Sequence, residues 1–475
     1  MRIFLLCIYF FITVGLFAQP GYKIDFKIKG LKDTTAYLGY FLLEGTHIKD
    51  TARINSRGAC RFEGTQILPQ GVYFLVLGKT RVFDFIVGHE QQFTLETSSE
   101  DYIKKMTVKG DDDNRLFFEN LLFVQGSHKE AEPFVEVLQD SSVKEDQKKV
   151  ARDNLAEINK KVVTYQRSIV EKFPKTVTAR LLNMNYPVQI PDPPKKADGS
   201  IDSTFQLRYY RQHYFDNFGL GDEVMLRQQK IVYWDKVKDY LDKLFIQQPD
   251  SIAKAIDNLV FVAKNNPTTY KYLVWKCIGN YQNPEIMGLD QVYVHLIDKY
   301  IATGEMDFWL DKKTIQNLKD HANKLRRAPI GAIAPNLIMQ NERLQPKSMY
   351  DLKNKYTILY FFKPSCGHCR EETPKLVSFY NNNKNKFDFE VFAVSTDTAL
   401  TEMKDFIKEM KTPWITVNGP RSYIKTHFME LYYAELTPTI YIIDRQKKII
   451  ARKLGVEQLD GFFNNYEKMV NLKNK

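Results

Sequence analysis

Two cysteines separated by two residues follow shortly after a continuous apolar run. The run is YTILYFF, from Tyr356 to Phe362, and the motif is CGHC, from Cys366 to Cys369. The residues after the motif place apolar side chains at helical spacing, at Leu376, Val377 and Tyr380. This order predicts a buried strand, a short turn and a helix that begins at the first cysteine.

Strand and helix patterns continue to alternate after this motif. FDFEVFAVS (387–395) predicts a second strand, 400–410 a helix, TPTIYIID (437–444) and KIIARKLG (448–455) a hairpin, and 459–466 a closing helix. Strands that alternate with helices imply a sheet with parallel strands, covered on both faces. We therefore expect an α/β domain over residues 327–475.

A CxxC pair is used by zinc sites, by covalent haem attachment and by redox couples. Structural zinc needs about four ligands, but the chain has no second CxxC and no HxxxH. Haem attachment needs a histidine directly after the second cysteine, where this chain has Arg370. The pattern therefore favours a redox couple, with no metal and no other cofactor.

The predicted start of the helix gives the two cysteines different roles. Free N–H groups and the positive end of the helix dipole favour the thiolate of Cys366, which is the attacking species. Cys369 lies one turn further on and can resolve a mixed disulfide. A protonated His368 would stabilise the Cys366 thiolate and make the disulfide more oxidising.

These residues resemble the thioredoxin-fold proteins of the TlpA/ResA type, exported bacterial thiol-disulfide oxidoreductases. Cys366, Gly367, His368 and Cys369 match the redox motif, and Pro374 matches the proline that bends the active-site helix. Thr437 and Pro438 match the cis-proline loop. The resemblance implies that this loop faces the cysteines and offers backbone groups to an extended substrate.

Further positions qualify the resemblance. Glu372 matches an acidic residue that tunes the cysteine pKa values and shuttles the proton of the resolving thiol; otherwise it is an ordinary charged residue of a first helical turn. Thioredoxins proper carry a buried Asp where this chain has Tyr360, and Phe362 and Ser365 also depart from their pattern. A peroxiredoxin motif starting at Pro364 fails, because His368 and Glu371 occupy its two required positions.

The residues before 327 carry no catalytic motif. Residues 20–112 contain strand patterns such as YKIDFKIKG, GVYFLVLG, RVFDFIVG and QQFTLET, which predict a β-sandwich-like domain. Residues 113–326 predict an α-helical domain, with one stripe that runs from Ala151 to Phe173. A β-rich domain, a helical domain and a TlpA-like module together resemble a group of bacterial envelope proteins.

The first residues predict export. Arg2 precedes an apolar run of 15 residues from Ile3 to Phe17, and Ala18 follows, so residues 1–19 are interpreted as a signal peptide. An uncleaved anchor is the weaker alternative, because a spanning helix needs 18 or more apolar residues. The expected location is therefore the periplasm or cell envelope.

The composition argues against two other classes of protein, nucleic-acid binders and disulfide-rich scaffolds. The net charge is +11, but basic and acidic residues are interspersed, so we expect no nucleic-acid partner. Outside the signal only Cys60, Cys277, Cys366 and Cys369 remain, too few for a disulfide scaffold.

Two functions stay open at this point. The first is an enzyme that exchanges disulfides with envelope proteins, as reductant or isomerase, with a membrane thiol reductant as electron donor; the resemblance suggests cytochrome c maturation as one setting. The second is an envelope binding or assembly protein whose upstream domains recognise a partner and whose thioredoxin module is not catalytic.

Overall fold

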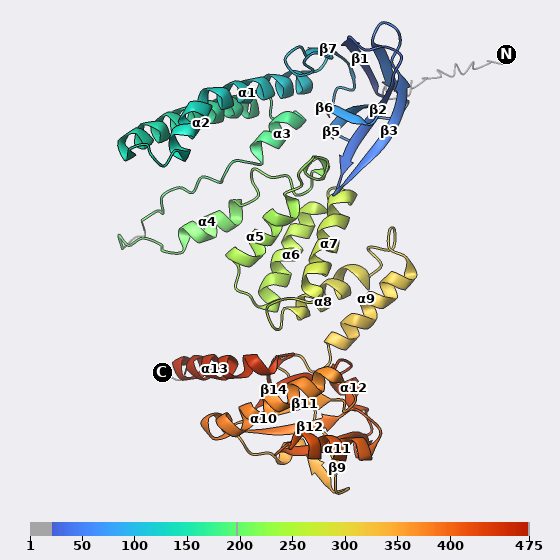
Figure 1. Ribbon diagram of the computed structural model, residues 1–475, viewed down its shortest axis with the longest axis vertical. Helices are drawn as coiled ribbons and strands as arrows, with labels where there is room; N and C mark the ends of the chain where they lie inside the picture. Colours follow the sequence, from blue (N-terminus) through green and yellow to red (C-terminus); the bar gives the residue numbers. More distant parts are fainter. Residues whose placement is uncertain (1–20, 196–197, 474–475) are drawn as a thin grey trace, which may run out of the picture. The chain divides into compact units, whose positions relative to one another are not determined.

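The computed structural model describes residues 21–195 and 198–473 (Figure 1). The predicted signal peptide lies outside these residues. The chain forms two compact units: the first runs to Leu244 and includes Phe261–Tyr270, and the second comprises Phe245–Val260 and Lys271–Lys475. Within the described part of the chain, every helix is too short or too polar to cross a membrane.

The first unit begins with two four-stranded sheets, ordered β4-β1-β7-β8 and β3-β2-β5-β6. Alternate residues of β1, such as Ile24 and Phe26, are buried in a shared core, as the period-two pattern predicted. Cys60 is buried in the same core. The strands are β1 (Lys23–Lys29), β2 (Thr35–Leu42), β3 (Gly45–Arg53), β4 (Ala59–Glu63), β5 (Gly71–Leu77), β6 (Thr80–Val87), β7 (Gln92–Ser98) and β8 (Thr107–Lys109).

Helices follow the sandwich, as predicted. The stripe of α2 buries Ala151, Ile158 and Ile169, and the long helices α1 and α2 lie side by side (Figure 1). The helices of this part of the chain are α1 (Asp112–Gln139), α2 (Glu145–Lys172), α3 (Val177–Asn183), α4 (Phe205–His213), η1 (Glu223–Leu226), α5 (Tyr233–Leu244), α6 (Pro249–Ala263), α7 (Pro267–Gln282), α8 (Asp290–Leu296), η2 (Ile297–Ile301) and α9 (Lys312–Leu325).

The second unit contains a seven-stranded sheet, ordered β10-β9-β13-β12-β11-β14-β15. The interior strand β11 pairs in parallel with β12 and antiparallel with β14. Its elements are β9 (Ile338–Asn341), β10 (Pro346–Ser348), η3 (Met349–Asp351), β11 (Tyr356–Phe362), α10 (Gly367–Phe387), β12 (Phe389–Ser395), α11 (Leu400–Met410), β13 (Ile415–Ser422), α12 (Phe428–Leu431), β14 (Thr439–Asp444), β15 (Ile449–Arg452), η4 (Val456–Gln458) and α13 (Leu459–Lys473).

Both faces of this sheet are covered. Ile358, Tyr360 and Phe362 pack into a core with α10, α11 and α13, whereas Leu359 and Phe361 pack into a second core with α12. All seven residues of β11 are therefore buried, which explains why its sequence is a continuous apolar run. The predicted fold class, a sandwich followed by helices and a C-terminal thioredoxin fold, is confirmed.

The predicted element order of the C-terminal domain was incomplete. Strands β9, β10 and β13 extend one side of the sheet beyond the predicted strands. β13 includes Gly419 and Pro420, residues typical of turns, and its register with β9 is irregular. β9 and β10 have only four and three residues, too few to show a period of two.

A buried ion pair joins α8 to β15 inside the second unit. The Arg452 guanidinium donates to Asp290 Oδ2 at 2.5 Å, and the two side chains are only 2% and 7% exposed. Arg452 Nη1 also donates to the backbone oxygens of Leu325, Arg327 and Ala328. One side chain of the sheet therefore holds α8 and the end of α9.

Removing the carboxylate of this pair should destabilise the unit strongly. In Asp290→Ala the Arg452 charge would stay buried without its counter-charge, so we expect the free energy of unfolding to fall by about 3–5 kcal/mol. Urea unfolding measures this. The control is Asp298→Ala, which breaks the surface pair with Arg326 and should cost at most about 1 kcal/mol. Equal, small losses in both variants would contradict a structural role for the pair.

Candidate active site

Cys366 lies at the point where α10 begins, as the sequence predicted. It is the N-cap residue of α10, and the backbone N–H of Cys369 donates to its Sγ at 3.4 Å. The side chain is half-buried. A sulfur at this position faces free N–H groups and the positive end of the helix dipole, which stabilise a thiolate.

The pKa of the Cys366 thiol lies below its ordinary value. Partial burial alone would raise the pKa, but hydrogen bonds from the Cys369 thiol, the Cys369 N–H and the His368 N–H outweigh it. Cys366 is thus the thiol that ionises first and can act as a nucleophile.

Cys369 has the opposite environment. Its side chain is buried among Leu376, Phe362 and other core residues. Burial, to which the nearby Cys366 adds, raises the pKa of its thiol to about 11. This thiol is protected from solvent and has to lose its proton before it can attack.

The sheet register brings the cis-proline loop to the first cysteine. Phe361, near the end of β11, pairs with Thr439 at the start of β14. The loop before β14 therefore lies beside the turn that leads to α10. The Thr437–Pro438 peptide bond is cis, and the Cys366 thiol donates to the Thr437 carbonyl oxygen at 3.4 Å.

The structure gives His368 a different setting from the one expected. Its imidazole is 75% exposed and Nδ1 lies 3.2 Å from Glu371 Oε2, so the ring pairs with a carboxylate and not with the Cys366 sulfur. The residue reaches Cys366 through its backbone N–H. Gly367 has open space where a Cβ would stand, so the turn there is not held by packing.

Glu372 lies near the cysteines in a largely buried position. Its side chain is only 15% exposed and Oε1 accepts from Lys375 Nζ at 2.5 Å. Pro374 lies inside α10, where it cannot donate a backbone hydrogen bond.

Sequence reasoning missed one partner of the site, Thr373. Its hydroxyl donates to the Cys369 carbonyl oxygen at 2.7 Å and lies 2.9 Å from the Tyr360 hydroxyl. Tyr360 is buried, and burial raises its pKa. A hydrogen-bonded pair of hydroxyl groups, from Tyr360 and Thr373, thus occupies the place where thioredoxins carry a buried Asp. The departure at Tyr360 was the available signal, but it did not name the partner.

A groove of about 530 Å³ lies beside the cysteine motif. Its walls include His368 and Glu372 from α10, and the cis-proline loop and the segment after β15 complete it; the further lining residues are Asn283, Tyr433, Leu436, Thr437, Pro438, Thr439, Ile440, Lys453, Leu454, Gly455, Val456 and Glu457. The predicted substrate-binding residues Thr437 and Pro438 and the predicted Glu372 therefore share one cavity.

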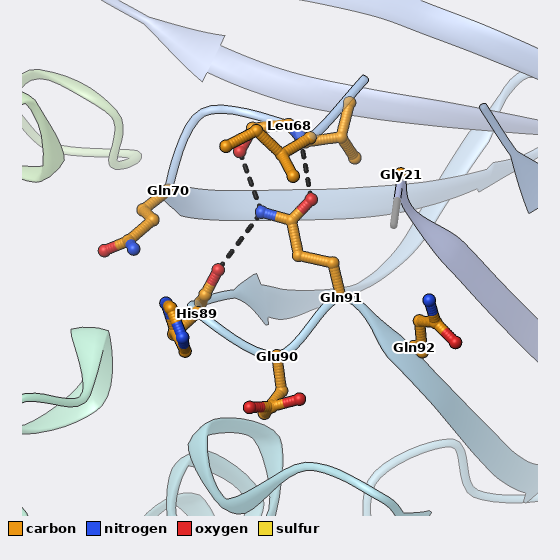
Figure 2. Close-up of a pocket in the computed structure, with 9 residues that line it drawn as sticks. Gly21, Leu68, Gln70, His89, Glu90, Gln91 and Gln92 are labelled. Atoms are coloured by element: carbon orange, nitrogen blue, oxygen red, sulfur yellow. Dashed lines mark hydrogen bonds between the residues drawn. The ribbon is translucent and has the colours of Figure 1, made fainter. Parts of the chain in front are cut away.

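A second cavity, of about 480 Å³, lies in the sandwich of the first unit. Figure 2 shows Gln91 at its centre, where the amide accepts from Leu68 N–H and donates to the carbonyl oxygens of Leu68 and Gly88. The Gln91 amide thus joins the loop that carries Leu68 to the loop that carries Gly88. The cavity contains no cysteine, and we assign the chemistry to the groove beside Cys366.

Three family matches cover most of the described chain. Residues 330–452 match the AhpC/TSA family, residues 144–324 a domain of unknown function (DUF5106), and residues 22–117 another domain of unknown function (DUF4369). The C-terminal part of this chain is a thioredoxin-like domain of the AhpC/TSA family. The resemblance predicted from the CGHC motif is confirmed.

Individual curated proteins are also similar to this chain. It is similar to the thiol-disulfide oxidoreductase ResA of Oceanobacillus iheyensis, at 27% identity over 158 residues, 32% of this chain and 78% of that protein. Probable nucleoredoxin 1 of Arabidopsis thaliana is 30% identical over 117 residues, 25% of this chain and 20% of that protein. The chain thus spans only about a fifth to a quarter of the first curated relatives that it matches.

A solved structure is also similar in sequence. A domain of a possible thiol-disulfide isomerase from Cytophaga hutchinsonii is 36% identical; the match covers 32% of this chain and 99% of that one, with a TM-score of 0.28.

The two thiols of the thioredoxin-like domain should titrate separately. Only a thiolate reacts with iodoacetamide, so the labelling rate rises with pH and levels off above the pKa. Cys366 should reach half its plateau below the ordinary thiol value of about 8.5, whereas Cys369 should need a pH near 11. Mass spectrometry of each labelled peptide measures both rates.

Two other cysteines serve as internal controls in this experiment. Cys60 and Cys277 are buried, and burial raises the pKa of both thiols. They should stay unlabelled while the protein is folded. Labelling of Cys369 before Cys366, or one shared profile for both, would contradict the assigned asymmetry.

Proposed function

We propose that this protein is a thiol-disulfide oxidoreductase that acts on protein disulfides through Cys366 and Cys369. The observation that carries the proposal is the asymmetry of the pair. Cys366 is accessible at a helix N-terminus with a lowered pKa, and Cys369 is buried one turn further on with a raised pKa. One thiol is thus suited to attack and the other to resolve.

In the reducing direction the Cys366 thiolate attacks one sulfur of a substrate disulfide. The substrate S–S bond breaks, a mixed disulfide forms, and the leaving thiolate takes a proton. Cys369 then loses its proton and attacks the Cys366 sulfur, which releases the second substrate thiol. The substrate gains two electrons and the pair becomes a disulfide; the reverse sequence oxidises a dithiol.

The neighbouring residues have distinct parts in this scheme. Glu372, three residues after Cys369 on α10, is the proposed acceptor of the Cys369 proton, and its carboxylate is held in place by the ion pair with Lys375. Gly367 and His368 tune the potential of the pair through the turn and its N–H groups. Thr437 and Pro438 position an extended substrate beside Cys366, since the Thr437 carbonyl already accepts from that sulfur.

The proposed setting is the bacterial periplasm or cell envelope. The N-terminal sequence supports export, and the similarity to ResA supports the class of reaction. The proposed substrates are envelope proteins, and a membrane thiol reductant would return electrons to the pair. A binding or assembly protein with an inert disulfide is not favoured, because Cys366 is accessible and has a lowered pKa.

Serine variants test the assignment of the two thiols. Cys366→Ser should reduce disulfide exchange to background, because the attacking atom is lost. Cys369→Ser should still attack and then accumulate a mixed disulfide, since no thiol remains to resolve it. Insulin reduction and non-reducing mass spectrometry measure the two effects.

The matched control is Cys60→Ala, which changes a buried cysteine of the sandwich core. This variant should reduce insulin at the rate of the unmodified protein. Full activity in both serine variants of the pair would reject the proposed function.

A further inference from the structure

One residue that lines the groove beside Cys366 comes from outside the thioredoxin-like domain. Asn283 lines the groove together with Leu436, Pro438 and Leu454, and it lies in the connection between α7 and α8. This connection belongs to the same compact unit as the active site. The helical region therefore contributes directly to the site, and not only through its connection in sequence.

The connection that carries Asn283 is fixed to the sheet a few residues further on. The backbone N–H of Arg452 donates to Met287 Sδ at 3.3 Å, and the Arg452 side chain pairs with Asp290. Lys453 and Leu454, the next residues of the chain, line the groove. The contact that anchors the connection thus lies directly beside the groove wall.

A second set of contacts reaches the cis-proline loop from α9. Glu435 lies two residues before Thr437, and its carboxylate pairs with Lys324 and Arg327. Arg327 also donates to the Met429 carbonyl oxygen. Residues of the helical region thus contact the loop on which the substrate is expected to lie.

An aromatic contact completes this support. Tyr433 lies edge-on to His321 of α9, with ring centroids 6.3 Å apart. The Lys453 ammonium stands 4.5 Å from the centre of the Tyr433 ring. Tyr433 and Lys453 both line the groove, so α9 also supports its floor.

We infer that the segment from Asn283 to Arg327 is part of the substrate-binding site and selects extended polypeptide disulfides over small ones. The inference rests on the proposed function. The side-chain amide of Asn283 can donate to and accept from a peptide backbone. Leu436, which is 74% exposed, offers an apolar contact beside it, and a groove of about 530 Å³ has room for several groups.

The test is Asn283→Arg in the full chain. Asn283 is exposed, so the substitution should leave the fold intact while it places a long charged side chain in the groove. Turnover is measured with insulin and with hydroxyethyl disulfide, with dithiothreitol as reductant. We expect kcat/KM for insulin to fall at least fivefold more than kcat/KM for hydroxyethyl disulfide, mainly through KM.

Two further variants separate binding from general damage. Asn385→Arg adds the same charge at an exposed position in the last turns of α10. It should leave the ratio of kcat/KM for insulin to kcat/KM for hydroxyethyl disulfide unchanged. Asn283→Gln keeps the amide, so its KM for insulin should stay close to that of the unmodified protein. An intact melting curve for each variant confirms folding.

The outcomes are distinct. A larger loss of kcat/KM with insulin than with hydroxyethyl disulfide in Asn283→Arg, absent from Asn385→Arg, supports the inference. Equal losses with both substrates, or no loss, would overturn it and leave the proposed function standing. If the unmodified chain reduced neither substrate, the proposed function would fall and the inference with it.

Discussion

The reactivity of the cysteine pair depends on β11, a strand whose two faces are both buried. Burial on both faces suits an interior strand of the sheet, and β11 has β12 on one side and β14 on the other. Its end determines where α10 begins, and hence where Cys366 stands. The same register sets Thr437 beside that sulfur. A single strand thus brings together a helix N-terminus and a carbonyl oxygen that lie 71 residues apart in the chain.

The chemical asymmetry of the pair follows from one turn of helix. Cys366 lies at the first turn, where N–H groups have no partner within the helix, and Cys369 lies on the face that packs into the core. The two thiols differ in burial, in hydrogen bonding and in the direction of their pKa shifts. The spacing of three residues places Cys369 about one turn further along nearly the same side of the helix, where its side chain is buried while the N-cap side chain of Cys366 is only half-buried.

Local patterns predicted the parts of this molecule that depend on local chemistry. The CGHC motif, the strand before it and the helix after it were all found in this way, whereas Pro438 was predicted from the family resemblance. The partner of the His368 imidazole was not, because the side chain turns toward Glu371 and its orientation depends on rotamers. Asn283 and Arg452 were missed for another reason: their significance rests on contacts between residues more than 120 positions apart, which periodicity cannot show.

The reduction potential of the Cys366–Cys369 pair tests the central claim most directly. The folded protein is equilibrated in graded dithiothreitol or glutathione buffers and alkylated, and the labelled thiols are counted by mass. The account predicts a two-electron transition of this pair alone, at a potential between about −270 mV, near thioredoxin, and about −120 mV, near a strong oxidant. A pair that could not be cycled in the folded protein would contradict the account.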